Sequence, residues 1–224
     1  MNGATQKQMQ EEQETVWYLE DIRELADAEP YTFYVPSSEV IAMLQAGDSV
    51  QLVFAYSDDE SGDEFSEGLW VRITEIAGDD FYGELESEPE SLPELQPGDE
   101  IEFTSYHITD TQQDDPVPNI VQQYSQGCFV TSRVLEDEQP VGALYRENPS
   151  DAEEEIADFS GWNIMAGDED DDYLDNPDNW HYVSLGTVQN IDDRFIDVLD
   201  APYDTEFEYD AEQDAFVEVE DDVE

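Results

Sequence analysis

Basic residues are almost absent from this chain. Its 224 residues include 6 Lys or Arg against 61 Asp or Glu, which gives a formal net charge of -55 at pH 7. The phosphate backbone of nucleic acids and anionic membrane surfaces both repel a protein of this charge. The composition therefore argues against nucleic acid and membrane partners.

Cysteine and long apolar runs are also scarce. Cys128 is the only cysteine, so no internal disulfide can form, and a reducing compartment is the natural expectation. No apolar run approaches the roughly 18 residues of a membrane span, and residues 1–13 lack the apolar core of a secretory signal. We therefore expect a cytoplasmic protein.

Folding is indicated by the apolar content, since hydrophobic residues make up 38% and aromatic residues 12% of the chain. The acidic residues are spread over both halves, which is typical of a surface adapted to high salt. The Debye length falls from about 10 Å at 0.1 M salt to about 3 Å at 1 M, so charge repulsion fades in brine. The alternative is a nucleic-acid mimic whose carboxylates imitate phosphates, and we favour salt adaptation.

Apolar spacing predicts a first domain of mixed helix and strand. Helical spacing from Val16 to Leu25 predicts an amphipathic helix that ends before Pro30. Ser37 or Ser38 suits the N-cap of a second helix that ends at Gly47. Strands are expected at residues 31–35, 50–56, 69–76, 81–85 and 101–106, with a hairpin turn at 77–80.

A second domain is expected after residues 112–126, where Asp and Pro residues interrupt the pattern. Helical packing is expected between Val188 and Leu199, because apolar residues recur there at helical spacing. The expected strands are a hairpin of 127–134 with 141–145, a third strand at 162–165, and a closing hairpin within 207–219.

We therefore predict an α+β protein with two small domains, each a mostly antiparallel sheet with one or two packed helices. The predicted organisation is a leader and helix (1–30), a first domain (31–111), a linker (112–126), a second domain (127–219) and an acidic tail (220–224).

Signatures of catalysis are missing from the sequence. His107 and His181 are the only histidines, and neither lies beside a serine or cysteine in a nucleophile motif. Cys128 opens an apolar strand and is interpreted as a core residue. No glycine-rich phosphate loop occurs. We therefore expect a non-enzymatic protein without a cofactor, and keep an unrecognised metal-dependent enzyme as the third hypothesis.

The acidic run from Gly167 to Trp180 begins like a calcium-binding loop, with alternating aspartates at Asp168, Asp170 and Asp172. An EF-hand loop needs Gly at its sixth position and Glu at its twelfth. Tyr173 and Asn179 stand there instead. We therefore expect a solvated loop without a tight calcium site.

A series of short motifs in the second half resembles the bacterial immunity protein 33 family, first catalogued as a domain of unknown function. The resemblance covers about residues 127–217, with an acidic insertion at 151–158. The motifs are Gly127-Cys128-Phe129-Val130-Thr131-Ser132-Arg133, Val141-Gly142-Ala143-Leu144-Tyr145-Arg146-Glu147, Ser160-Gly161-Trp162, Gly167-Asp168-Glu169-Asp170 and Asp175-Asn176-Pro177-Asp178-Asn179.

The first half resembles a second family of unknown function, the YegJ-like domain, over about residues 31–111. The usual aromatic residue after the closing Asp110 is replaced by Thr111. The motifs that carry this resemblance are Glu67-Gly68-Leu69-Trp70-Val71, Phe81-Tyr82-Gly83-Glu84-Leu85, Gly98-Asp99-Glu100-Ile101 and His107-Ile108-Thr109-Asp110.

The first resemblance implies an antidote that neutralises a toxin of a polymorphic toxin system by binding it. Such an interface needs an aromatic anchor ringed by carboxylates that attract basic groups. Trp162 and Tyr145 are also good core residues, so Trp180 is the better exposed anchor. The alternative function is an acidic decoy for a nucleic-acid-binding protein. The candidate partner-binding surface consists of Tyr145, Arg146, Trp162, Asp168, Asp170, Asp175, Asn176, Asp178, Asn179 and Trp180.

Overall fold

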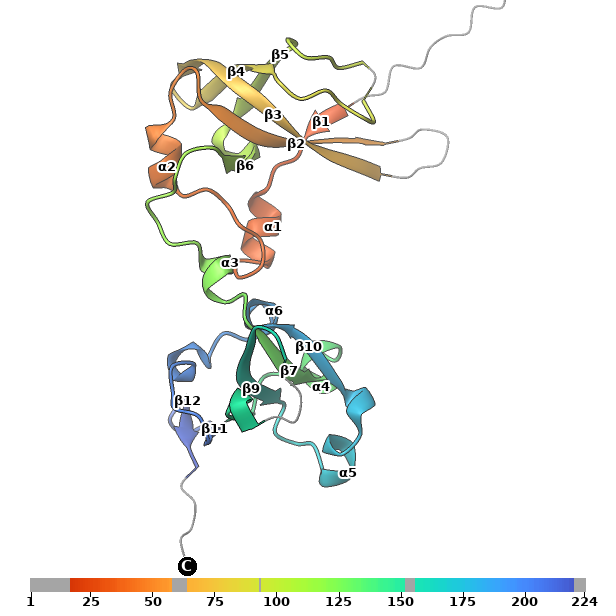
Figure 1. Cartoon of the computed structure of the whole chain (residues 1–224), viewed down its shortest axis with the longest axis vertical. Coiled ribbons are helices and arrows are strands. Elements are labelled where there is room, and N and C mark those ends of the chain that lie inside the picture. Colours follow the sequence, from red (N-terminus) through yellow and green to blue (C-terminus); the bar gives the residue numbers. More distant parts are fainter. Residues whose placement is uncertain (1–16, 58–63, 93, 152–155, 220–224) are drawn as a thin grey trace, which may run out of the picture. The chain divides into compact units, whose positions relative to one another are not determined.

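The computed structural model describes residues 17–57, 64–92, 94–151 and 156–219, which form two compact units (Figure 1). The first unit contains Met1–Arg23 and Val35–Val117, and the second contains Glu24–Tyr34 and Pro118–Glu224. The predicted α+β class with two small domains is confirmed. Most of the predicted leader, the acidic tail and part of the acidic insertion lie outside the described residues.

The first unit is built on a six-stranded antiparallel sheet. The strands run in the order β1 (Trp17–Leu19), β2 (Ser49–Ser57), β3 (Glu64–Ala77), β4 (Asp80–Leu85) and β5 (Glu100–Thr104), and β6 (Ile108–Thr111) also pairs with β2. Helix α2 (Ser38–Met43) and the 3-10 turn η1 (Ser105–His107) accompany them. Alternate residues such as Leu52, Phe54 and Phe103 point inward and are fully buried.

Two local predictions for this unit are confirmed. Ala77 pairs with Asp80, so the hairpin turns where the sequence predicted it. Ser37 is the N-cap of α2, and its hydroxyl oxygen accepts a hydrogen bond from the Val40 amide at 3.1 Å.

The predicted helix from residue 16 to 25 is wrong in its first half. Trp17–Leu19 forms β1 and pairs with Phe54–Tyr56 of β2, while helix α1 covers only Arg23–Ala28. Trp17 packs against Phe54 with ring centroids 5.3 Å apart. Tertiary pairing with an existing strand outweighs local helical spacing in this segment. The predicted strand at 31–35 is also absent, since this described segment forms turns.

The second unit holds a mixed six-stranded sheet in the order β10, β7, β9, β8, β11 and β12. The strands are β7 (Gly127–Thr131), β8 (Ala143–Arg146), β9 (Phe159–Met165), β10 (Trp180–Ser184), β11 (Thr205–Asp210) and β12 (Ala215–Glu218). The helices are α3 (Ile120–Gln123), α4 (Ser132–Leu135), α5 (Asp171–Leu174) and α6 (Leu185–Gln189), with 3-10 turns η2 (Pro149–Asp151), η3 (Pro177–Asn179) and η4 (Ile196–Val198).

The predicted hairpin between residues 127–134 and 141–145 is wrong. β9 lies between β7 and β8, and it runs parallel to β7. Both β7 and β9 consist almost entirely of buried residues, and strands of this kind occupy the centre of a sheet with a neighbour on each side. The predicted closing hairpin is confirmed, since β11 pairs with β12.

The core of the second unit is formed by fully buried aromatic and aliphatic residues such as Phe195, Ile164 and Val188. Cys128 belongs to it, and burial raises the pKa of its thiol to about 12. Its interpretation as a core residue is confirmed, because a buried protonated thiol is a poor nucleophile. In the part of the chain that the structure describes, no helix has the length and apolarity needed to cross a membrane.

Candidate functional site

The loop that follows β9 is organised around the carboxylate of Glu169. One oxygen accepts hydrogen bonds from the Thr131 hydroxyl at 2.6 Å and the Ala166 amide at 2.9 Å, and the other accepts from the Gly167 amide at 2.7 Å. Gly167 has a φ of +86°, which few other residues adopt without strain. Burial acts to raise the pKa of Glu169, but these hydrogen bonds outweigh it and hold the pKa below its ordinary value.

Further polar side chains of the same loop fix its two short helical turns. Asp170 is the N-cap of α5 and accepts from the Tyr173 amide at 2.9 Å, and Asn176 caps η3 in the same way. The Asn179 side-chain amide donates to the Tyr173 carbonyl at 2.8 Å. The indole N–H of Trp180 donates to the Leu174 carbonyl at 3.0 Å. Side chains of the loop therefore hydrogen-bond much of its own backbone.

Arg133 from α4 ties the loop to the sheet. Its guanidinium forms an ion pair with Asp168, and it lies over the ring of Tyr173 at 4.7 Å from the ring centroid. Asp168 remains mostly exposed beyond this contact. Asp168 and Asp170 are thus engaged by Arg133 and by the backbone of α5, which is unlike a set of converging calcium ligands. Within the described ranges, no group of three or more His, Cys, Asp or Glu side chains is placed to hold a metal ion.

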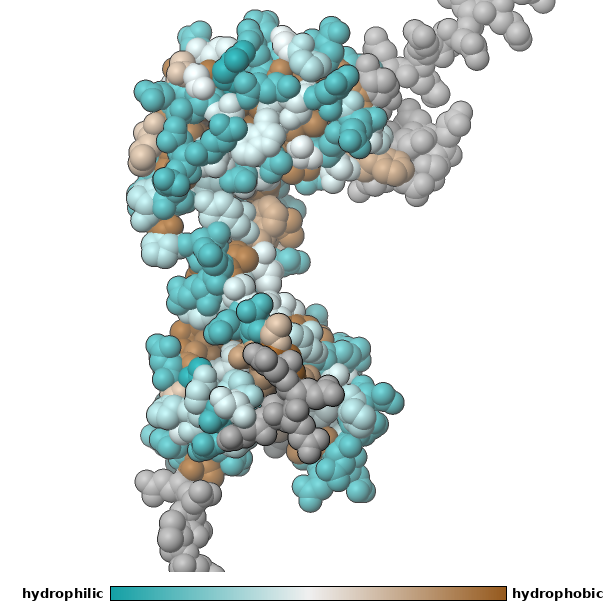
Figure 2. Space-filling model, viewed as in Figure 1, coloured by the Kyte–Doolittle hydropathy of each residue, from teal (hydrophilic) through white to brown (hydrophobic). Residues whose placement is uncertain are grey.

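Four carboxylates of the loop point into solvent. Each is exposed, and in the described part of the chain none has a hydrogen-bond or ion-pair partner; they are Asp171, Asp172, Asp175 and Asp178. Figure 2 shows this end of the second unit, at the position of α5 in Figure 1, as a hydrophilic surface. We call these four residues together with Asp168 and Trp180 the acidic loop surface.

The structure brings most of the predicted site residues together in this loop. The members that it unites are Asp168, Asp170, Asp175, Asn176, Asp178, Asn179 and Trp180. Tyr145 lies half-buried in β8, opposite Asn163 of β9. Trp180 is half-buried at the start of β10 rather than freely exposed.

The inclusion of Trp162 in an exposed surface is wrong. Its side chain is only 1% exposed, and its indole N–H donates to the Leu199 carbonyl at 3.3 Å. Arg146 has a structural role as well, because its guanidinium donates to the carbonyls of Leu199 and Ala201. It also lies 4.7 Å from the ring centroid of Tyr203. Arg146 therefore holds the segment before β11 against the sheet.

Sequence reasoning missed Glu169, Thr131 and Arg133, which shape the loop. Glu169 was hidden among many carboxylates, and only its place directly after Gly167-Asp168 distinguishes it. Thr131 and Arg133 lie more than thirty residues earlier and reach the loop through the sheet. Their side chains could be assigned only once β7 and β9 were known to be neighbours.

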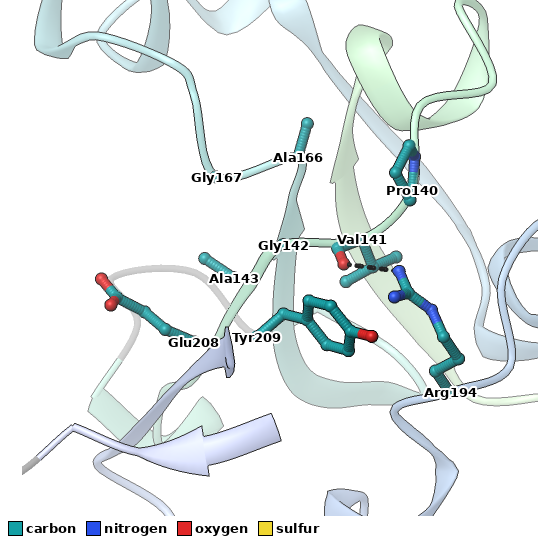
Figure 3. Close-up of a pocket in the computed structure, with 9 residues that line it drawn as sticks. All are labelled: Pro140, Val141, Gly142, Ala143, Ala166, Gly167, Arg194, Glu208 and Tyr209. Carbon is teal, nitrogen blue, oxygen red and sulfur yellow. Dashed lines mark hydrogen bonds between the residues drawn. The ribbon is translucent and has the colours of Figure 1, made fainter. Parts of the chain in front are cut away.

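A pocket of about 380 Å³ lies next to Gly167, which is one of its lining residues (Figure 3). It is lined by Pro140, Val141, Gly142, Ala143, Ala166, Gly167, Arg194, Glu208 and Tyr209. Arg194 is its only cation, and Figure 3 shows the guanidinium beside the Tyr209 ring with a hydrogen bond to the Val141 carbonyl. The same guanidinium is paired with buried Asp192.

Replacing Glu169 by Gln is expected to loosen the loop and to cost about 1 kcal/mol, because the Thr131 hydroxyl and the Ala166 amide, whose hydrogen bonds to Glu169 are partly buried, lose their charged acceptor. The lowered pKa of Glu169 means that this stabilisation is present above the ordinary value of 4.5 and is lost as pH falls through the folded-state pKa. Melting temperatures should therefore differ between wild type and Glu169→Gln at pH 7 and converge in acid. Glu212→Gln, at an exposed position with the same change in charge, is the control. Equal melting of all three proteins at pH 7 would contradict this role for Glu169.

Comparison with known proteins gives one family match in each half of the chain. The immunity protein Imm33 domain matches residues 128–220, which confirms the first resemblance. A family of uncharacterised proteins conserved in bacteria, DUF2314, matches residues 29–115, so the first half resembles a family of unknown function. No curated protein and no solved structure gives a match. The second half of the chain is therefore similar to the immunity protein Imm33 domain, and the first half is similar to DUF2314.

Proposed function

We propose that this protein is a non-enzymatic, cytoplasmic immunity protein that neutralises a cognate toxin by binding it through the acidic loop surface. The observation that carries the proposal is the Imm33 match over residues 128–220, which contains the whole loop. The partner is a protein with a basic surface, because four unpaired carboxylates repel acidic partners and attract Lys and Arg.

The charge of the chain supports fast capture of such a partner. A net charge of -55 produces a negative potential around the molecule that steers a basic protein towards it. Exposed carboxylates at the edge of an interface contribute more to the association rate than to affinity. Affinity then needs an anchor, and half-buried Trp180 at the start of β10 is the large aromatic side chain in this surface.

The internal hydrogen bonds of the loop support the same assignment. Glu169, Asp170 and Asn176 hold the backbone, so Asp171, Asp172, Asp175 and Asp178 are presented with little freedom in the loop itself. A preorganised loop loses less conformational entropy when it binds. The backbone-capping residues build the loop, and the exposed carboxylates remain available for a partner.

Neutralising the exposed carboxylates should abolish capture without unfolding the protein. The variant replaces Asp171, Asp172, Asp175 and Asp178 by Asn, and the matched control replaces Asp197, Asp200, Glu206 and Glu212, also exposed in the second unit, by their amides. Both variants change the net charge by four. The measurement is capture of a binding protein from native extract, identified by mass spectrometry. We expect the loop variant to lose at least tenfold in captured amount and the control to keep most of it.

Equal loss in both variants would mean that net charge, and not this loop, determines binding. Retained capture by the loop variant would refute the assignment of the surface. A captured protein that binds DNA or RNA and is displaced by added nucleic acid would instead favour the acidic decoy.

A further inference from the structure

One segment of the second unit comes from far outside the Imm33 match. Residues 29–34, which we call the strap, precede the body of the first unit in the chain but pack with the second unit. The Tyr31 amide donates to the Asn190 side-chain oxygen at 3.0 Å, and its hydroxyl donates to Asp193 at 2.7 Å. The ring meets Tyr124 edge to face, with centroids 5.7 Å apart.

Asn190, the C-cap residue of α6, forms hydrogen bonds with two neighbouring residues of the strap. The Asn190 side-chain amide donates to the Thr32 hydroxyl at 2.6 Å, so this one residue bonds two neighbouring positions of the strap. Gly186 permits a close approach of backbones, because a Cβ added there would lie 2.4 Å from the Tyr31 carbonyl oxygen. The pKa of the Tyr31 hydroxyl is raised to about 12, mainly by burial and secondly by its hydrogen bond to Asp193.

We infer that the strap is a structural part of the Imm33-like unit, so that this unit is completed by a segment from the start of the DUF2314-like match. The chain enters the second unit at Glu24–Tyr34, builds the body of the first unit over Val35–Val117, and returns at Pro118. The body of the first unit, Val35–Val117, is in this sense inserted into the second unit, and Met1–Arg23 of the first unit precedes the strap. Residues 128–220 alone lack the strap that packs against them.

A substitution at Gly186 tests whether the strap is a structural part of the second unit or is only loosely attached to it. Replacing Gly by Ala inside a helix normally stabilises it. Gly186→Ala in the full chain should instead expel the strap, because the new methyl group overlaps the Tyr31 carbonyl. Hydrogen exchange followed by mass spectrometry reads this directly, since local opening exposes amides. We expect exchange of residues 29–34 to become at least tenfold faster, with exchange in β2 of the first unit unchanged.

Asn190→Ala provides a second test that adds no bulk, because it removes the hydrogen bonds to Tyr31 and Thr32. This variant should also make hydrogen exchange of residues 29–34 faster. It decides the question if the Gly186→Ala protein does not fold. Tyr18→Ala, at an exposed tyrosine of β1, is the control and should leave the strap unchanged. Unchanged exchange of residues 29–34 in Asn190→Ala, or a Gly186→Ala protein that melts higher with its strap still protected, would overturn the inference.

Discussion

The melting temperature of this protein should rise by roughly 10 °C or more between 0.1 M and 2 M KCl, a shift that corresponds to about 2 kcal/mol in a domain of about 100 residues. The cause is screening, because 61 acidic side chains repel one another in the folded state and salt shortens the range of that repulsion. Circular dichroism melts at a series of KCl concentrations measure it. The same series near pH 4.1, the isoelectric point, provides the control, and the salt effect should largely vanish there.

A melting temperature that stays flat with salt at pH 7 would contradict salt adaptation as the reason for the charge. An acidic fold that is equally stable in dilute buffer carries its charge for another purpose. The nucleic-acid mimic would then become the better explanation of the composition.

Replacing Arg194 by Ala should destabilise the second unit by about 3 kcal/mol or more, because it leaves a buried carboxylate without its partner. The two guanidinium nitrogens of Arg194 that face Asp192 lie 2.8 and 2.5 Å from its carboxylate oxygens, and only 7% of the Asp192 side chain is exposed. Asp192 also accepts from the Val141 amide at 2.9 Å, which fixes the strand entering β8. Urea unfolding at pH 7 measures the loss.

Arg72→Ala is the matched control, because Arg72 pairs with Glu84 and Glu86 on the surface with nearly half of its side chain exposed. Exposed pairs contribute less than about 1 kcal/mol. Burial acts to raise the pKa of Asp192, but its hydrogen bonds from Arg194 and Val141 lower it overall. The contribution is therefore present above the ordinary value of 3.8 and lost as pH falls through the folded-state pKa. Equal losses in Arg194→Ala and Arg72→Ala would contradict a structural role for the buried pair.

In the first unit, the turn and the helix cap that have clear local sequence signals were predicted correctly. The turn at residues 77–80 and the N-cap at Ser37 follow from turn and capping chemistry that acts over a few residues. Trp17–Leu19 has helical spacing of its apolar residues but forms a strand, because it pairs with β2, nearly forty residues further along the chain. A single sequence contains no signal for that distant partner.

Strand existence in the second unit was predictable, but strand order was not. β7 and β8 are successive apolar strands, and a hairpin is the default connection between such strands. Their separation by β9 depends on a parallel pairing of β7 with residues 159–165, across the acidic insertion. The same limitation hid the contacts of Thr131 and Arg133 with the loop after β9.

The sequence predicted the loop that holds most of the candidate residues, and its use as a binding surface is the proposal made above. The run from Gly167 to Trp180 forms one loop, and its exposed aspartates are where the sequence placed them. The roles within it were not predictable, because capping by Asp170 and Asn176 and exposure of Asp175 and Asp178 depend on backbone angles. Trp162 and Arg146 were assigned to the surface, although packing makes the first a core residue and the second a brace for residues 199–201.

The central claim is that a protein partner binds the acidic loop surface of the Imm33-like unit. Hydrogen exchange of the captured complex, compared with the free protein, tests it most directly because it maps the covered backbone without any substitution. The account predicts slower exchange over residues 168–182 and no change in β4 and β5 of the first unit. Protection confined to the first unit, with residues 168–182 exchanging as in the free protein, would contradict it.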